Sequence, residues 1–122
     1  GKERITLWGS GKPRREFIFS EDVADASVFA MNNAERLQNI HYNLGTGIDY
    51  SIKEISGIIS EIVGFEGEIE WDTTKPDGTP RKLLESKKFN QLGWSSRTAL
   101  EEGLLKTYNW FLENEKYSWS VR

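Results

Sequence analysis

The chain has 122 residues, which suits one domain large enough to bury a hydrophobic core, and its 37% hydrophobic and 29% charged residues exclude disordered and fibrous classes. The net charge of −3 argues against a nucleic-acid partner, and no apolar run approaches the roughly 20 residues that cross a bilayer. Without Cys, disulfides and thiolate metal sites are excluded and a cytoplasmic location is the default expectation.

The first predicted elements are two strands, residues 4–8 and 15–19, both rich in Ile, Leu, Trp and Phe. Turn residues separate them at positions 9–13, which predicts an antiparallel β-hairpin. A helix over residues 20–32 is predicted next, because Ser20 can cap it and acidic side chains fill its first turn.

The middle of the chain predicts a short strand over residues 41–44 and then the most clearly marked helix. Ser51 and Glu54 form a capping box, in which each side chain binds the backbone donor of the other. Ile recurs on one face of residues 52–62, and Gly64 suits the left-handed turn that ends a helix.

The remaining sequence predicts a strand over residues 68–72, a turn-rich loop over residues 73–80 and a brief helix over residues 86–92. The last helix is predicted to open with a second capping box at residues 98–101 and to continue to about Leu112. The order of helices and strands predicts a mixed α/β (α+β) fold.

The sequence contains no catalytic constellation that we favour. Its single His, His41, is expected to be a structural residue at a strand, and the scattered carboxylates predict no metal site. The Gly45 to Gly47 turn is not interpreted as a dinucleotide loop, since that fingerprint needs a third Gly where this chain has Tyr50.

Residues 8–17, WGSGKPRREF, form the first candidate binding segment. Guanidinium groups offer a fork of donors suited to a diphosphate, and the indole of Trp8 can stack on a base. Neighbouring strand residues point to opposite faces, so we expect only one of Arg14 and Arg15 to reach a shared ligand. The alternative is a solvated basic turn beside a core Trp.

Residues 75–84, KPDGTPRKLL, form the second candidate segment. Asp77 could accept hydrogen bonds from a sugar or base, while Arg81 and Lys82 could meet phosphate. The alternative, which the chemistry alone favours, is that Asp77 stabilises its own turn and the basic pair faces water.

With these segments the chain resembles the extended short-chain dehydrogenase/reductases, and among them the GDP-L-fucose synthases. Those are NADPH-dependent 3,5-epimerase/4-reductases acting on GDP-4-keto-6-deoxy-mannose. The KPDGTPRKLL segment is the most specific to this branch. The motifs that carry the resemblance are WGSGKPRREF, SEDVADAS (20–27), YNLGTG (42–47), SIKEI (51–55), KPDGTPRKLL, LGW (92–94), LEEGL (100–104) and TYNWFLEN (107–114).

The resemblance implies that Trp8, Arg15, Asp77 and Lys82 bind the substrate, with Arg15 on the diphosphate and Trp8 and Asp77 at the nucleotide end. Arg14 stands where the family often has an apolar residue. The resemblance implies NADP(H) as the cofactor of the parent enzyme. The family's cofactor loop and catalytic side chains have no counterpart in this sequence, so no catalytic, cofactor-binding or metal-binding residue is predicted here.

The resemblance further implies that residues 1–122 form one carboxyl-terminal substrate-binding region without its Rossmann domain. Residues 20–44 would pack on that domain in the parent, and the uncovered apolar surface predicts self-association. Two alternatives stay open: the equivalent part of another nucleotide-sugar epimerase or dehydratase, and a non-catalytic nucleotide-sugar-binding module.

Overall fold

The computed structural model describes residues 3–38 and 40–114 and confirms the predicted mixed α/β fold. Its strands form two small sheets. None of the helices in these residues is long and apolar enough to cross a membrane. In chain order the elements are β1 (Arg4–Trp8), β2 (Arg14–Glu16), α1 (Ser20–Asn32), the 3-10 helix η1 (Ala34–Arg36), β3 (Asp49–Ser51), α2 (Ile52–Val63), β4 (Glu68–Asp72), β5 (Arg81–Lys82), α3 (Lys87–Asn90) and α4 (Leu100–Glu113).

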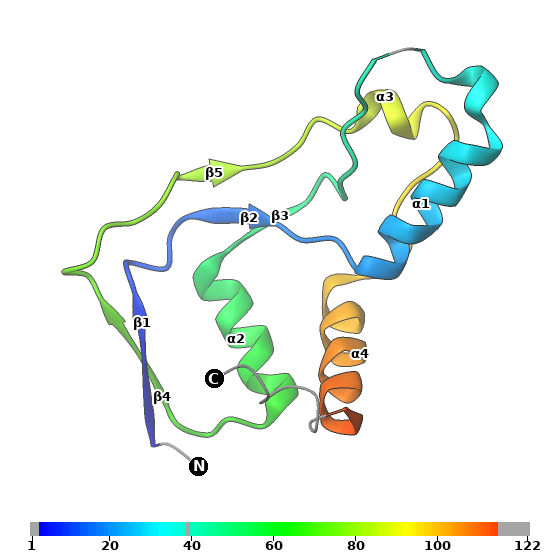
Figure 1. Ribbon diagram of the computed structural model, residues 1–122. Helices are drawn as coiled ribbons and strands as arrows, with labels where there is room; N and C mark the ends of the chain where they lie inside the picture. Colours follow the sequence, from blue (N-terminus) through cyan, green and yellow to red (C-terminus); the bar gives the residue numbers. More distant parts are fainter. Residues whose placement is uncertain (1–2, 39, 115–122) are drawn as a thin grey trace, which may run out of the picture.

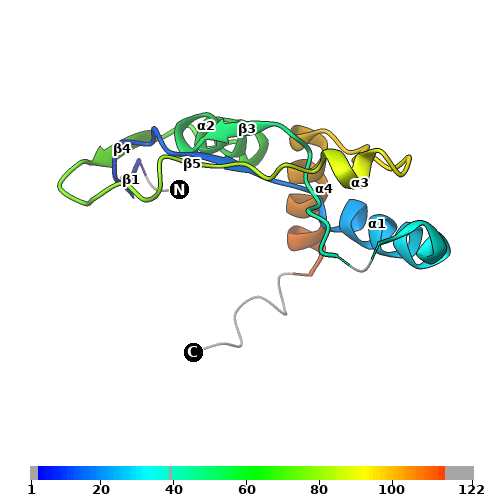
Figure 2. The same ribbon diagram turned by 90° about the horizontal axis from the view of Figure 1, so that it is seen from above.

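The elements are spread along an elongated molecule (Figures 1 and 2). The β1–β4 pair lies at one end and α1 with α3 at the other, and the β3-β2-β5 sheet runs between them. Helices α2 and α4 pack against each other beside this sheet. The central sheet therefore connects the two ends of the chain's fold.

The predicted β-hairpin is wrong, because the two N-terminal strands belong to different sheets. Strand β1 pairs in parallel with β4, whereas β2 pairs antiparallel with β3 and parallel with β5. The turn between β1 and β2 contacts the N-terminus of α2. The carbonyl of Gly11 accepts a hydrogen bond from the amide of Lys53, and that of Pro13 accepts one from the amide of Ile52. The turn thus holds the start of α2 instead of closing a hairpin.

The predicted capping box of α2 is confirmed. The hydroxyl of Ser51 accepts from the amide of Glu54 at 3.1 Å, and the Glu54 carboxylate accepts from the amide of Ser51 at 2.6 Å. Gly64 ends the helix with φ 67°, the left-handed conformation that Gly adopts without strain. Local signals were sufficient for this helix because its caps lie within its own sequence.

The second predicted capping box is wrong. Helix α4 begins at Leu100, and its cap residue makes no side-chain hydrogen bond. The amide and hydroxyl of Thr98 instead donate to the carboxylate of Asp22 at 3.0 and 2.9 Å, and the amide of Arg97 donates to it at 3.1 Å. Asp22 thereby joins the first turn of α1 to the segment that leads into α4.

Residues 41–44 are not a strand, contrary to the prediction. In the described residues the segment belongs to neither sheet, and two of its side chains, Tyr42 and Leu44, pack on the hydrophobic core. The Tyr42 ring meets Phe89 edge-on, with 6.1 Å between the ring centroids. Phe89 also packs on Trp94, whose indole N–H donates to Asp25 at 2.8 Å.

Large apolar side chains remain exposed on α1 and α4. Val28 and Met31 share a face of α1 with exposed fractions of 56% and 77%, and Trp110 of α4 is 62% exposed. We expect this chain to self-associate, because contiguous uncovered apolar surface finds partners. Sedimentation should show a mass that rises with concentration, and Met31→Glu should reduce that rise. A clean monomer at high concentration would contradict the expectation.

Candidate functional site

Strands β2 and β5 bring four cationic side chains together as two neighbouring pairs. In their parallel register Arg14 lies beside Arg81, and Arg15 lies beside Lys82. Because side chains alternate along a strand, the first pair and the second pair project from opposite faces of the small sheet. Like charges side by side on adjacent strands repel, so a counter-charge or a bound anion would stabilise each pair.

The first pair has its counter-charge within the chain. The carboxylate of Asp49, in β3, accepts from Nε of Arg14 at 2.9 Å and from Nε of Arg81. The Asp49 side chain is 7% exposed. The hydrogen bonds from Arg81 and Arg14 hold the pKa of Asp49 below its usual value. Arg14 also donates to Glu54 at 3.2 Å, so this face of the sheet is an ion-pair network.

The second pair is free of such a partner: in residues 3–38 and 40–114, neither Arg15 nor Lys82 forms an ion pair. One guanidinium nitrogen of Arg15 donates to the carbonyl of Thr79 at 2.7 Å, which turns the side chain toward the loop that precedes β5. Lys82 is exposed. The side chains of Arg14 and Arg15 contact different partners, which is consistent with the expected opposite orientation.

Asp77 joins the loop that precedes β5 to the turn after β1 by hydrogen bonds. One carboxylate oxygen accepts from the amide of Ser10 at 2.7 Å and the other from its hydroxyl at 2.6 Å. Gly9 makes room for the contact, since a Cβ there would lie 2.5 Å from Oδ1 of Asp77. The alternative that Asp77 stabilises its own turn is therefore wrong. The hydrogen bonds from Ser10 lower the pKa of Asp77.

Trp8 ends β1 with 76% of its surface exposed, so the alternative of a core Trp is wrong at this position. The ammonium of Lys75 lies 5.7 Å from its ring centroid, a cation–π contact from the same loop as Asp77. Trp71 is the aromatic that packs here: a Cβ on Gly11 would lie 2.7 Å from its ring. The exposed indole is therefore available for stacking.

The structure thus brings all four predicted site residues to one region, in which the turn after β1, strand β2 and the segment 75–82 meet. Sequence reasoning missed three residues that organise this region: Ser10, Asp49 and Lys75. Ser10 and Lys75 stand inside the two candidate segments, so their position was a usable signal. Asp49 follows a Gly-Ile pair with no motif around it.

The Gly45 to Gly47 turn does not fit a dinucleotide phosphate. The carboxylate of Glu16 occupies it, accepting from the amide of Gly47 at 2.7 Å and from the hydroxyl of Thr46 at 3.3 Å. A Cβ on Gly45 would lie 2.5 Å from the same carboxylate. A second anion in this turn would meet the negative charge of Glu16, so the turn is not a phosphate-binding loop.

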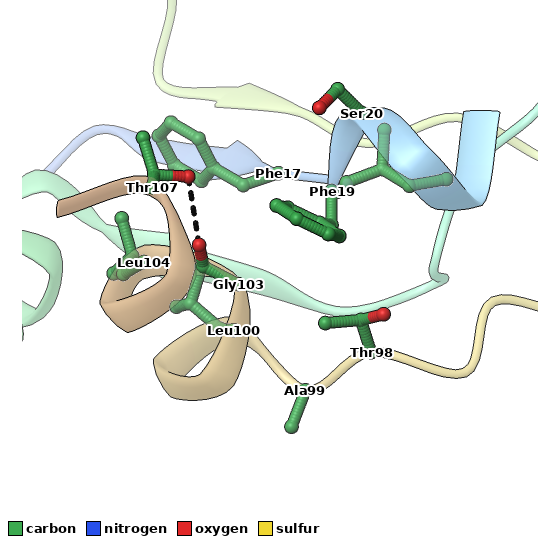
Figure 3. A pocket seen from close by; sticks show the side chains of 10 residues that line it. Phe17, Phe19, Ser20, Thr98, Ala99, Leu100, Gly103, Leu104 and Thr107 are labelled. Carbon is green, nitrogen blue, oxygen red and sulfur yellow. Dashed lines mark hydrogen bonds between the residues drawn. The ribbon is translucent and has the colours of Figure 1, made fainter. Parts of the chain in front are cut away.

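A separate cavity of about 250 Å³ lies between the start of α1 and the first turns of α4. Figure 3 shows Phe17 and Phe19 on one side of it and Leu100 and Gly103 on the other. Its lining is mainly apolar, and the hydroxyl of Thr107 donates to the carbonyl of Gly103. None of the four predicted site residues lines this cavity.

Comparison with known proteins identifies the relatives of this chain. The model of the NAD dependent epimerase/dehydratase family matches residues 1–45. The putative GDP-L-fucose synthase 2 of Arabidopsis thaliana is 48% identical over 112 residues, which are 92% of this chain and 34% of that protein. The chain is therefore similar to members of the NAD dependent epimerase/dehydratase family.

Other similar proteins are also named GDP-L-fucose synthases or synthetases. The GDP-L-fucose synthase of Escherichia coli is 46% identical over 91% of this chain and 37% of its own length. The crystal structure of a GDP-L-fucose synthetase from Naegleria fowleri bound to NADP has a TM-score of 0.84 and 28% identity over 93% of this chain. The resemblance to GDP-L-fucose synthases is confirmed. The chain spans about a third of the length of the curated relatives it matches.

Proposed function

We propose that this chain supplies the GDP-sugar-binding surface of a GDP-L-fucose synthase. The observation that carries the proposal is the register pair of Arg15 and Lys82, two cations on one sheet face without a carboxylate partner in the described residues. A diphosphate provides the two negative charges that such a pair attracts, and the Arg fork suits its oxygens.

The rest of the surface suits the remainder of a nucleotide sugar. The exposed ring of Trp8 offers a stacking face for the base. Asp77 keeps the loop of residues 75–79 closed on Ser10, so that Trp8 and Arg15 stay at a constant spacing. The diphosphate would thus meet an Arg15 guanidinium already held by hydrogen bonds, which lowers the entropy lost on binding.

In the complete protein that carries this chain, we propose conversion of GDP-4-keto-6-deoxy-mannose to GDP-L-fucose by 3,5-epimerisation and 4-reduction. The relatives' names support this activity, and NADPH is the proposed hydride source. The cation pair of Arg15 and Lys82 and the exposed Trp8 support a role for this chain in binding and orienting the GDP-sugar. A cytoplasmic location stays a prediction.

Calorimetric titration with GDP, UDP and ADP tests the proposal. We expect the complete protein to bind GDP most tightly, and this chain alone to keep the same order with weaker affinity. Equal affinity for all three nucleotides would contradict the GDP assignment and favour another nucleotide-sugar enzyme. Binding without any catalytic activity of the complete protein would favour a non-catalytic module.

A further inference from the structure

Asp49 joins two strands that are not neighbours. The sheet order is β3-β2-β5, so β3 and β5 lie on opposite sides of β2. The Asp49 carboxylate crosses β2 by accepting from Arg14 and from Arg81, and its backbone carbonyl accepts from Arg14 at 2.7 Å. Asp49 contacts both of these adjacent arginines, whereas Glu54 contacts Arg14 and not Arg81 in the described residues.

Strand β5 needs such an attachment because it is short. It comprises Arg81 and Lys82 alone, so its ladder has few backbone hydrogen bonds. The alternation of side chains makes Arg81 and Lys82 move together: if Arg81 leaves Arg14, Lys82 also leaves Arg15. The contact made by Asp49 on one face therefore controls the spacing of the two cations on the other.

We propose that Asp49 is a positioning residue that keeps Lys82 in register with Arg15 for an anionic ligand, from the opposite face of the sheet. This inference rests on the proposed function, because the ligand is taken to be the diphosphate of a GDP-sugar. Asp49 itself points away from that ligand. Without Asp49, Arg14 and Arg81 would repel each other and open the β2–β5 register.

Asp49→Asn in the complete protein tests the positioning role against a purely electrostatic effect, because the two predict opposite changes in GDP affinity. Removing a carboxylate makes the sheet more positive, so long-range electrostatics alone would tighten GDP binding. The positioning role predicts weaker binding, by about tenfold. Glu66→Gln is the matched control, because it removes one exposed negative charge away from the sheet and should leave GDP affinity unchanged.

A second variant keeps the test decisive if Asp49→Asn does not fold. Arg81→Gln removes the other end of the contact and should also weaken GDP binding by about tenfold, whereas Lys88→Gln, an exposed cation on α3, should not. The double variant Asp49→Asn/Arg81→Gln should bind as weakly as the worse single variant, since both break one contact, whereas opposed charge effects alone would return its GDP affinity toward normal.

The outcomes separate this inference from the proposed function. If folded Asp49→Asn binds GDP as tightly as the unchanged protein or more tightly, and Arg15→Ala still weakens binding, the positioning role is wrong. The proposed function then stands. The positioning role is also wrong if Asp49→Asn lowers the melting temperature but leaves GDP affinity normal at temperatures where the variant is folded. That is the pattern of a purely structural residue. Loss of selectivity for GDP together with a neutral Arg15→Ala overturns the proposed function instead.

Discussion

Arg15→Ala is expected to weaken GDP binding about ten- to a hundredfold. The substitution removes a charge-assisted contact to the diphosphate, which typically contributes about 1.5–3 kcal/mol. Arg15 is suited to this role because its guanidinium lies against the carbonyl of Thr79, on the sheet face where Lys82 is exposed. Calorimetry with GDP on the complete protein measures the loss.

Two arginines serve as controls for this experiment. Arg36→Ala removes an exposed cation on η1 and should leave the affinity unchanged. Arg14→Ala should act less on binding than Arg15→Ala, since the Arg14 side chain contacts Asp49 and Glu54 on the opposite face. If Arg14→Ala proves the more damaging change, the assignment of the two faces is wrong.

The sequence predicted the local structure well and the strand pairing poorly. The helix cap at Ser51 and the turn at Gly64 were correct, because each depends on residues within a few positions. The hairpin was wrong because β1 pairs with residues 68–72, and the turn chemistry at residues 9–13 does not encode a partner so distant. Thr98 was misassigned because Asp22, far away in sequence, binds its hydroxyl.

In the candidate site, too, local sequence predicted some residues, and the residue that depends on distant partners was missed. Trp8, Arg15 and Lys82 lie in segments with recognisable composition, and the structure gathers them into one region. Their roles in binding remain predictions. Asp49 carries no local signal, because its importance depends on two arginines that reach it from separate strands. The role of such a buried carboxylate can be recognised only when the order of the strands in the sheet is known.

This chain alone is expected to have no reductase or epimerase activity, whereas the complete protein should have both. Reduction needs a hydride donor held against the sugar and a proton donor in reach of its carbonyl. The sequence has no Gly-x-x-Gly-x-x-Gly loop, and no Tyr is followed by Lys four residues later. The turn that most resembles a phosphate loop holds the carboxylate of Glu16.

The assay follows NADPH oxidation with GDP-4-keto-6-deoxy-mannose as substrate, and the chain should not exceed the rate without protein. Calorimetry with GDP on the same sample provides the control, since retained binding would show that the chain is folded and the inactivity is chemical. Glu16→Gln adds a second comparison: removing its charge should not create NADPH binding, because the Gln side chain still fills the turn and the third glycine of a dinucleotide site is lacking. Sustained NADPH oxidation by the purified chain would mean that its own residues supply the proton donor and the cofactor site, and the assignment of a binding role alone would then be wrong.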